Sequence, residues 1–331
     1  MTYDNIKLDK GLYTSAKGFT ASLEEIDPSE NYSGTALEGL DAYQRQLKRF
    51  DIKVSGENSD SISKFFQTTD SAALFPEYVS RAVLQGMEEE DNLSKIIATT
   101  TTIDSLDYRA VESIPMEKEL AEVAEGAYIP QTTIKTKERL TRLHKRGRML
   151  VASYEAIKYQ KLDLFTITLK QIGAYIARSQ FADAIDEIKT SEYKAISSSD
   201  TSYSYSNLVD LWNLLSPYKM TTIVACGSVV CDLLKLPEFR DSTAGLNFHG
   251  TGNMITPLGA QIVKYDDPDL EYILALDKSA ALEKVQAGGI ITEYDKLIDR
   301  QLERAAITAT AGFSSLIGNA AAFLALESAG D

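Results

Sequence analysis

A stripe of apolar residues at helical spacing dominates the stretch from 154 to 188. Its members recur at intervals of three and four residues and so share one helix face: Phe165, Leu169, Ile172 and Ile176. No proline interrupts the stretch, and Gly173 is its only glycine. A helix of about 35 residues would be about 50 Å long. We therefore predict one continuous helix that acts as the spine of the fold.

Two neighbouring stretches of opposite charge predict a long β-hairpin. Residues 112–125 hold five glutamates against one lysine, and residues 135–148 hold seven basic residues against one glutamate. The basic side chains alternate as in a strand, with one slip between Arg139 and Arg142. Arms of about 15 residues would reach about 50 Å, yet an isolated two-stranded ribbon is marginal in water. We expect the hairpin to lie on a neighbouring subunit; an ordinary solvated surface hairpin is the alternative.

The first 70 residues are polar and acidic, and they hold one candidate amphipathic helix at 36–50. The apolar face of this helix would consist of Leu40, Tyr43, Leu47 and Phe50. One helix cannot bury such a stripe alone, so it needs either the body of the protein or another subunit as a partner. We predict extended flanks, which would make residues 1–70 an arm rather than a packed domain.

A compact α/β pattern follows the polar linker at 197–200. Ser206 is placed to cap a helix that Pro217 ends. The further elements expected from apolar runs and β-branched residues are strands at 99–103, 221–225, 261–265 and 272–276 and a short helix at 229–236. Residues 297–326 return as small apolar residues that suit a strand packed on the long helix.

The composition is that of a globular protein, with 331 residues of which 44% are hydrophobic and 25% charged. The net charge of −14 argues against a large nucleic-acid-binding surface, because affinity for phosphates depends on excess cations. It does not exclude enclosing nucleic acid without holding it. No apolar window approaches the length of a membrane span, and no secretory signal is recognised. Cys226 and Cys231 are interpreted as reduced thiols in a core.

Groups suited to catalysis or metal binding are few. The histidines, His144 and His249, are too few for a histidine-based zinc site. The sequence contains no phosphate-binding loop, dinucleotide fingerprint or nucleophile elbow. The acidic cluster Asp266, Asp267 and Asp269 is interpreted as an exposed turn, with a cation site as the alternative. We expect no catalytic residue, no metal and no cofactor.

The order of these parts resembles the major capsid proteins of tailed double-stranded-DNA bacteriophages, which have the HK97-like fold. Residues 68–79 (TTDSAALFPEYV) resemble the segment that opens the body in that family. Residues 121–127 (AEVAEGA) resemble the tip region of its extended loop, and 150–154 (LVASY) the entry to its spine helix. Residues 253–259 (NMITPLG) resemble the segment that leads into a strand of its axial domain. The resemblance covers residues 68–326 and rests on order and spacing rather than on one motif.

The resemblance implies an α+β, HK97-like capsid fold with four parts. They are an N-terminal arm with one amphipathic helix (1–70), a peripheral domain with the spine helix (71–109, 151–203 and 286–331), an extended β-hairpin loop (110–150) and an axial domain (204–285). It also implies a structural protein, not an enzyme, that assembles as hexamers and pentamers into an icosahedral head enclosing double-stranded DNA. The virion is the expected location, after assembly in the cytoplasm of the bacterial host.

The expected partners are other copies of the chain, together with portal and possible scaffold or decoration proteins. DNA would be enclosed without sequence-specific binding, and no membrane would be involved. The candidate inter-subunit contacts are Glu117, Glu119, Glu122, Lys135, Lys137, Arg139, Arg142, Arg146, Arg148, Leu40, Leu47 and Phe50. From charge complementarity we expect the basic limb to meet the acidic patch 88–91 of a neighbour.

Some members of the family weld their shells by a lysine–asparagine isopeptide bond that a glutamate assists. Residues 305–326 hold Asn319 but no acid, so we expect no such cross-link, because the amine would lack a base. We also expect the N-terminal arm to be retained. Two alternatives stay open: an encapsulin-type nanocompartment shell, which a long polar arm disfavours, and a soluble α+β enzyme or binding protein.

Overall fold

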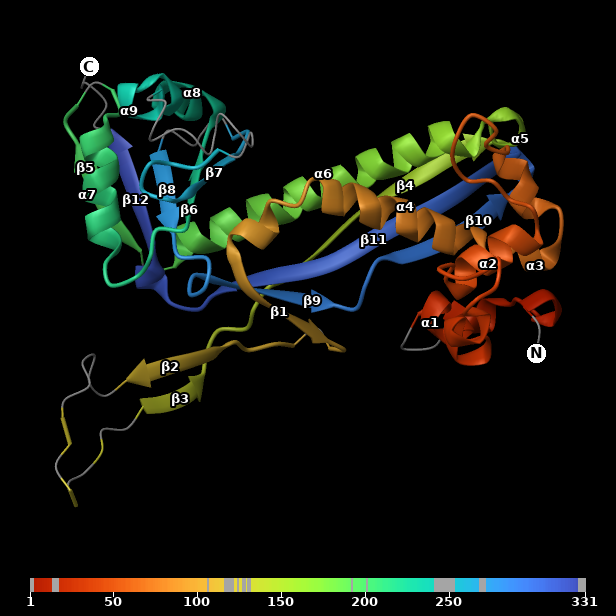
Figure 1. The fold of residues 1–331 in the computed structure, drawn as a ribbon, viewed down its shortest axis with the longest axis horizontal. Helices are drawn as coiled ribbons and strands as arrows, with labels where there is room; N and C mark the ends of the chain where they lie inside the picture. The colour runs from red at the N-terminus through yellow and green to blue at the C-terminus, as the bar shows by residue number, and fades with distance from the viewer. Residues whose placement is uncertain are drawn as a thin grey trace. The chain divides into compact units, whose positions relative to one another are not determined.

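The chain folds into two compact units (Figure 1). The computed structural model describes residues 3–13, 18–105, 107–115, 122–123, 125–126, 129, 132–191, 193–200, 202–240, 254–267 and 272–326. Unit 1 comprises Met1–Glu90, Lys145–Arg178 and Gly289–Ala309; unit 2 comprises Asp91–His144, Ser179–Gly288 and Thr310–Asp331. These units cut across the predicted domains, because residues 1–70 belong to the same unit as the helix that follows them, and the predicted spine helix contributes to both.

Unit 1 consists mainly of helices packed beside three strands. Its helices are α1 (Phe19–Ile26), α2 (Ala42–Arg49), α3 (Thr69–Ala72), α4 (Phe75–Glu89), α5 (Tyr154–Tyr159) and the first part of α6 (Leu162–Thr190). Its 3-10 turns are η1 (Tyr3–Asn5), η2 (Lys10–Tyr13), η3 (Ser29–Tyr32), η4 (Ile62–Phe66) and η6 (Ile298–Arg300). Its strands are β10 (Ile291–Leu297), most of β4 (Leu143–Ser153) and the first part of β11 (Leu302–Ser315). Both β4 and β10 pair with β11.

The core of unit 1 is built on aromatic side chains and a close helix contact. Phe75 stacks on Phe165, and Phe65 lies 5.3 Å from Tyr78 between ring centroids. Helices α4 and α6 meet at two glycines. A Cβ added to Gly86 would lie 2.1 Å from the carbonyl oxygen of Lys170, so only glycine fits at this crossing.

The N-terminal segment is folded rather than extended, which corrects the predicted arm. Its described residues contain α1 in addition to the predicted helix, and α2 begins at Ala42 with a capping box on Asp41. Tyr43 and Leu47 are buried in the core of unit 1. Polar contacts hold this segment together in addition to apolar packing. The buried guanidinium of Arg45 donates hydrogen bonds to the carboxylate of Asp27 and to the carbonyl of Leu40. Sequence periodicity does not reveal such a buried polar network.

The predicted spine helix is interrupted once. Helix α5 ends at Tyr159, and α6 begins at Leu162 and continues for 29 residues. Neither proline nor glycine causes the break. The backbone N–H of Ile62 donates to the carbonyl of Gln160, and the N–H of Leu162 donates to the carbonyl of Asp60. A passing segment therefore takes backbone hydrogen bonds that a continuous helix would need for itself.

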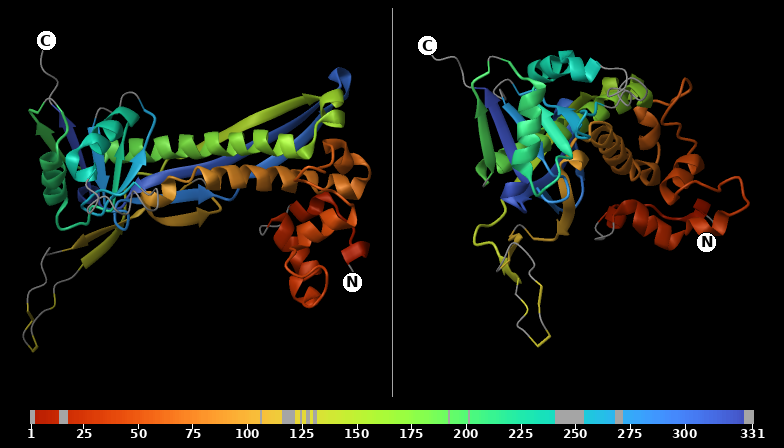
Figure 2. Two further views of the ribbon diagram at one scale, coloured as in Figure 1. Left: turned by 45° about the horizontal axis from the view of Figure 1, so that its top comes forward. Right: turned by 60° about the vertical axis from the view of Figure 1, so that its left-hand side comes forward.

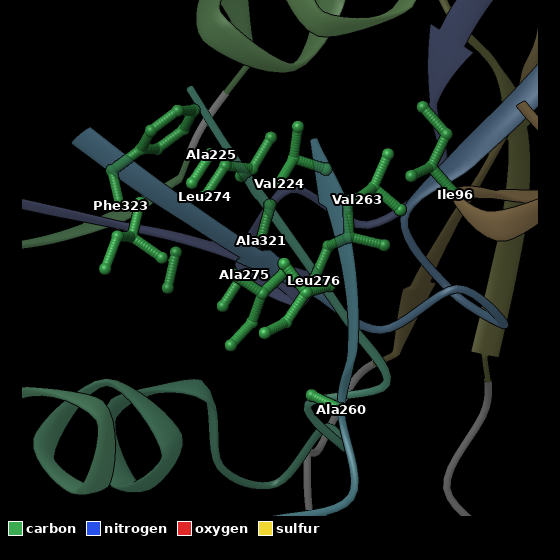
Figure 3. Close-up of a cluster of buried hydrophobic side chains, with 14 of the residues drawn as sticks. Ile96, Val224, Ala225, Ala260, Val263, Leu274, Ala275, Leu276, Ala321 and Phe323 are labelled. Carbon is green, nitrogen blue, oxygen red and sulfur yellow. The ribbon is translucent and has the colours of Figure 1, made fainter. Parts of the chain in front are cut away.

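Unit 2 contains a five-stranded mixed sheet in the order β5-β12-β8-β6-β7. The strands are β5 (Lys194–Ser198), β12 (Ala321–Leu326), β8 (Tyr272–Leu276), β6 (Thr222–Ala225) and β7 (Gln261–Lys264). Apolar side chains from β6, β7, β8 and β12 gather in its core (Figure 3). Helices α7 (Tyr205–Leu215), α8 (Gly227–Lys235) and α9 (Pro237–Arg240) belong to the same unit. The predicted cap of α7 was two residues late, because Ser204 and not Ser206 accepts from the Asn207 N–H.

A second group of strands in unit 2 lies at the base of the predicted hairpin. Strand β1 (Ile97–Ile103) pairs in parallel with β9 (Leu282–Ala287), which pairs antiparallel with the last residues of β11. The remaining elements are the hairpin strands β2 (Val111–Pro115) and β3 (Thr132–Thr136) and the turns η5 (Leu93–Lys95) and η7 (Gly318–Ala320). Cys226 is buried but Cys231 is exposed, so only one of the two thiols fits the core interpretation. Among the described residues, no helix is long and apolar enough to cross a membrane.

Candidate inter-subunit surface

Strands β2 and β3 form the predicted hairpin in the described part of the chain. The register pairs Val111 with Thr136 and places Glu112 directly opposite Lys135. Five residues on each side are paired in the described part of the chain. In the views of Figures 1 and 2, the ribbon formed by β2 and β3 lies apart from the sheet β5-β12-β8-β6-β7 of the same unit. The register therefore places one acidic and one basic position of the two predicted arms opposite each other near the base of the hairpin.

The basic limb divides between two structures, which corrects the prediction of one long arm. Its first part is β3, and residues 143–148 belong instead to β4, which pairs with β11. The break in alternation that was expected between Arg139 and Arg142 falls where the chain passes from β3, which pairs with β2, to β4, which pairs with β11. Between β3 and β4, two backbone hydrogen bonds hold the chain beside the segment that precedes β2. The Lys137 N–H donates to the carbonyl of Ala110 and the Thr141 N–H to that of Tyr108, both at 2.8 Å.

A buried carboxylate anchors the segment that precedes β2 to the neighbouring strands of unit 2. Glu283 of β9 is 5% exposed and accepts hydrogen bonds from the hydroxyls of Tyr108, at 2.8 Å, and Thr101, at 2.5 Å. Burial raises the pKa of Tyr108, and the Glu283 hydrogen bond and charge raise it further. The tyrosine therefore stays a neutral donor. This contact holds the start of the hairpin segment on β9.

The basic limb borders a cavity of about 230 Å³ in unit 2. Lys137, Arg139 and Arg142 line it together with Glu187 of α6. The ammonium group of Lys137 donates to the carbonyl of Ser315 at the end of β11. Burial raises the pKa of the Glu187 carboxyl, although the charges of Arg139 and Lys137 oppose that rise. The cavity thus combines three predicted contact residues with one acid that the sequence analysis missed.

A second acid on the same helix holds the beginning of β4. Asp183 Oδ1 lies 3.2 Å from His144 Nδ1. Asp183 and Glu187 are four residues apart, so they occupy one side of α6. That i, i+4 spacing was the available signal in the sequence. It did not identify Asp183 as a partner of His144, because helix spacing says nothing about which strand passes beside the helix.

Replacing Glu187 with glutamine should stabilise unit 2 at alkaline pH and leave it unchanged in acid. The folded pKa of Glu187 is raised, so its contribution to stability is present below the unfolded pKa and is lost as pH rises through the folded pKa. Glutamine does not titrate and avoids this loss. Thermal unfolding followed by circular dichroism at about pH 4 and pH 8 would measure the difference, with the exposed Glu138→Gln as control. A variant less stable than the wild type at pH 8 would contradict this account.

The other predicted contact residues lie in different places. Arg148 stacks over Tyr175 of α6 at 5.0 Å, Arg146 is half-buried in β4, and Lys135 and Glu122 are exposed. Leu47 is buried in the core of unit 1, Phe50 packs on the same core and Leu40 is half-buried. Leu47 and Phe50 therefore pack on the core of their own chain, and their expected role between subunits stays a prediction. Glu117 and Glu119, and also His249, lie outside the described residues.

The acidic patch 88–91 is partly used within its own unit. Glu89 Oε1 lies 2.6 Å from Lys170 Nζ, and Glu90 Oε1 lies 2.7 Å from Arg178 Nη2. Two of its acids already have cations of the same chain beside them. The patch is therefore a weaker counterpart for a neighbour's basic limb than its composition indicated.

No metal-binding cluster of His, Cys, Asp and Glu side chains is found among the described residues. Asp266 lies 3.1 Å from Lys264, and Asp267 lies 3.9 Å from Lys189. Two members of the predicted acidic turn thus lie beside lysines; Asp269 lies outside the described residues.

Comparison with known proteins identifies the fold through structure alone. No family model and no curated protein matches the sequence. A virus-like particle from Pyrococcus furiosus matches with a TM-score of 0.51 at 14% identity, over 75% of this chain and 98% of that one. The capsid of a native GTA particle, computed with C5 symmetry, matches with a TM-score of 0.53 at 15% identity, over 70% and 89% of the two chains. This chain therefore has the fold of these particle-forming proteins, the HK97-like capsid fold of mixed helices and strands.

Proposed function

We propose that this chain is a major capsid protein, which assembles as hexamers and pentamers into the icosahedral head of a tailed double-stranded-DNA phage. The observation that carries the proposal is the fold shared with a virus-like particle, over 98% of that chain. The N-terminal segment, which the sequence analysis assigned to an arm, adds a folded part to unit 1.

The exposed apolar side chains of the hairpin support association between copies. Ile134 in β3 is 72% exposed and Ile129 is 71% exposed. A two-stranded ribbon with such side chains in water is marginal by itself. Covering them with a second copy would bury apolar surface and stabilise the ribbon. The extended loop would thus lie on a neighbouring subunit.

The charge balance supports containment rather than binding of DNA. With a net charge of −14, an inner wall made of this chain would repel phosphates and leave packaged DNA mobile. Portal proteins, and scaffold or decoration proteins where they exist, would be its further partners. The function is mechanical, and the proposal assigns no catalytic group.

Electron microscopy of the purified chain tests the proposal directly. We expect closed shells with fivefold and sixfold capsomers, and nuclease-protected double-stranded DNA inside particles isolated from infected cells. Ile134→Asp should abolish shells, whereas Thr133→Asp, which adds the same charge at the adjacent exposed position of β3, should retain them. A chain that stays monomeric at every concentration would overturn the proposal. Shells filled with an enzyme instead of DNA would favour the encapsulin alternative.

A further inference from the structure

The segment between β3 and β4 lies against the last residues of β11 and is fixed there at several points. Backbone hydrogen bonds from Lys137 and Thr141 hold it to the segment that precedes β2. A Cβ added to Gly312 of β11 would lie 2.4 Å from the Arg142 carbonyl oxygen, so the two backbones are in close contact. The ammonium group of Lys137 donates to the carbonyl of Ser315. The side chains of this segment therefore project from a backbone that is held in place.

Three cations of this segment border one cavity of unit 2. Lys137, Arg139 and Arg142 line the volume of about 230 Å³, and Glu187 is the single acid among its described lining residues. The charges of Lys137 and Arg139 act on Glu187. Neither guanidinium, however, forms an ion pair or a hydrogen bond with another described residue. Three cations held beside one acid repel one another, and an anion in the cavity would relieve that repulsion.

Two hydroxyl groups add neutral donors to the same cavity. Thr141 is 8% exposed and Ser315 is 6% exposed, and both residues line it. In the part of the chain that the structure describes, neither hydroxyl has a hydrogen-bond partner. Polar side chains in residues as buried as these usually have one. Charged and neutral donors are thus offered from two sides, by the segment before β4 and by the end of β11.

We propose that this cavity binds a free tetrahedral oxyanion of the phosphate class. The planar guanidinium groups of Arg139 and Arg142 can each donate to two oxygens of such an anion, and Lys137 adds a third positive charge. A tetrahedral anion has oxygens on every side and can accept from both groups of donors, whereas a carboxylate offers two oxygens in one plane. The net charge of −14 disfavours the close approach of a DNA duplex as the source of the phosphate. This inference does not depend on the proposed self-assembly.

Titration calorimetry with sulfate tests the site in the full-length chain. Sulfate is the suitable probe because, unlike phosphate, it keeps its charge near neutral pH, and sodium chloride of equal ionic strength serves as the blank. Arg139→Ala and Arg142→Ala should each weaken sulfate binding about tenfold or more, since each removes charged donors. Arg240→Ala is the matched control, because Arg240 is an exposed arginine of unit 2 outside the lining of the cavity. It should leave the affinity unchanged.

Removing the acid of the cavity should have the opposite effect. Glu187→Gln should tighten sulfate binding about threefold or more at about pH 8, because the carboxylate that opposes the anion is gone. Glu138→Gln removes an acid from an exposed position of the same segment, which does not line the cavity, and should change the affinity by less than about 1.5-fold. A purely structural role of Glu187 would give weaker binding or none, and circular dichroism would show whether the variant is folded.

Four outcomes would overturn the oxyanion site, and each leaves shell formation to be judged separately by electron microscopy. The first is a folded wild-type chain that takes up neither sulfate nor inorganic phosphate. The second is an equal loss of affinity in Arg240→Ala, which would mean attraction by charge alone. The third is displacement of sulfate by a short DNA duplex, since the phosphate would then come from nucleic acid. The fourth is loss of sulfate when the chain assembles, because the donors would then serve a neighbouring copy.

Discussion

Replacing Arg45 with alanine should lower the free energy of unfolding of the N-terminal part of unit 1 by about 3–5 kcal/mol. The side chain is 0% exposed, and its Nε lies 2.9 Å from Asp27 Oδ2. It also donates to Ser29 Oγ and to the carbonyls of Leu40 and Asp27. Asp27 is itself 1% exposed. Truncation would leave a buried carboxylate without its cation and several acceptors without a donor.

Hydrogen exchange followed by mass spectrometry is the suitable measurement. The single tryptophan, Trp212, lies in unit 2, so intrinsic fluorescence would not report on this region. We expect residues 19–49 of Arg45→Ala to lose protection while unit 2 keeps it. Lys48→Ala in the same helix is the matched control, because Lys48 is exposed and should change stability by less than about 0.5 kcal/mol. Unchanged protection in Arg45→Ala would mean that this network does not hold the segment.

The substitution Gly173→Ala should destabilise unit 1, although alanine is the better helix former by about 1 kcal/mol. A Cβ at this position would lie 2.0 Å from the carbonyl oxygen of Val83 and 2.8 Å from the N atom of Met87. Both are backbone atoms of α4, so no side chain can turn away. Helices α4 and α6 would have to separate, and overpacking of this kind costs about 1–3 kcal/mol or more.

Thermal unfolding by circular dichroism would measure this loss. Gly289→Ala is the matched control, because an added Cβ there meets no atom within 4 Å. The double variant Gly86→Ala/Gly173→Ala should cost less than the sum of the single changes, since separating the helices once relieves both clashes. A more stable Gly173→Ala protein would show that helix propensity outweighs the crossing.

The apolar stripe of α6 was predictable because helical periodicity is a local property. Leu169, Ile172 and Ile176 are all buried as expected. The break before Leu162 was not predictable, since its cause is a segment about 100 residues earlier in the chain that forms backbone hydrogen bonds across it. The role of Gly173 could not be predicted from the sequence for the same reason. Its sequence context indicates a weak point in a helix, and only the position of α4 explains why glycine is needed there.

Charge pattern predicted part of the candidate surface. Opposite charges indicated that two limbs pair, and the register confirms this for Glu112 and Lys135. The charge pattern could not indicate where pairing between the two limbs stops. The second part of the basic limb lies in β4, which pairs with β11, a strand more than 150 residues away in the sequence. Likewise, Glu283 became visible as an anchor of Tyr108, and Glu187 as part of the cavity beside the basic limb, only when folding brought these residues together.

The amino-acid sequence by itself determined the order of the elements, the absence of recognisable catalytic motifs and the excess of negative charge, because these follow from local periodicity and composition. Tertiary structure decided that the N-terminal segment is packed, since burying Arg45 requires partners from three separate positions of the chain. It also decided which strands remain at the edges of unit 1, because an edge exists only where no other segment has paired. Local physics specifies elements, whereas the surfaces available to other molecules depend on what the rest of the chain has covered.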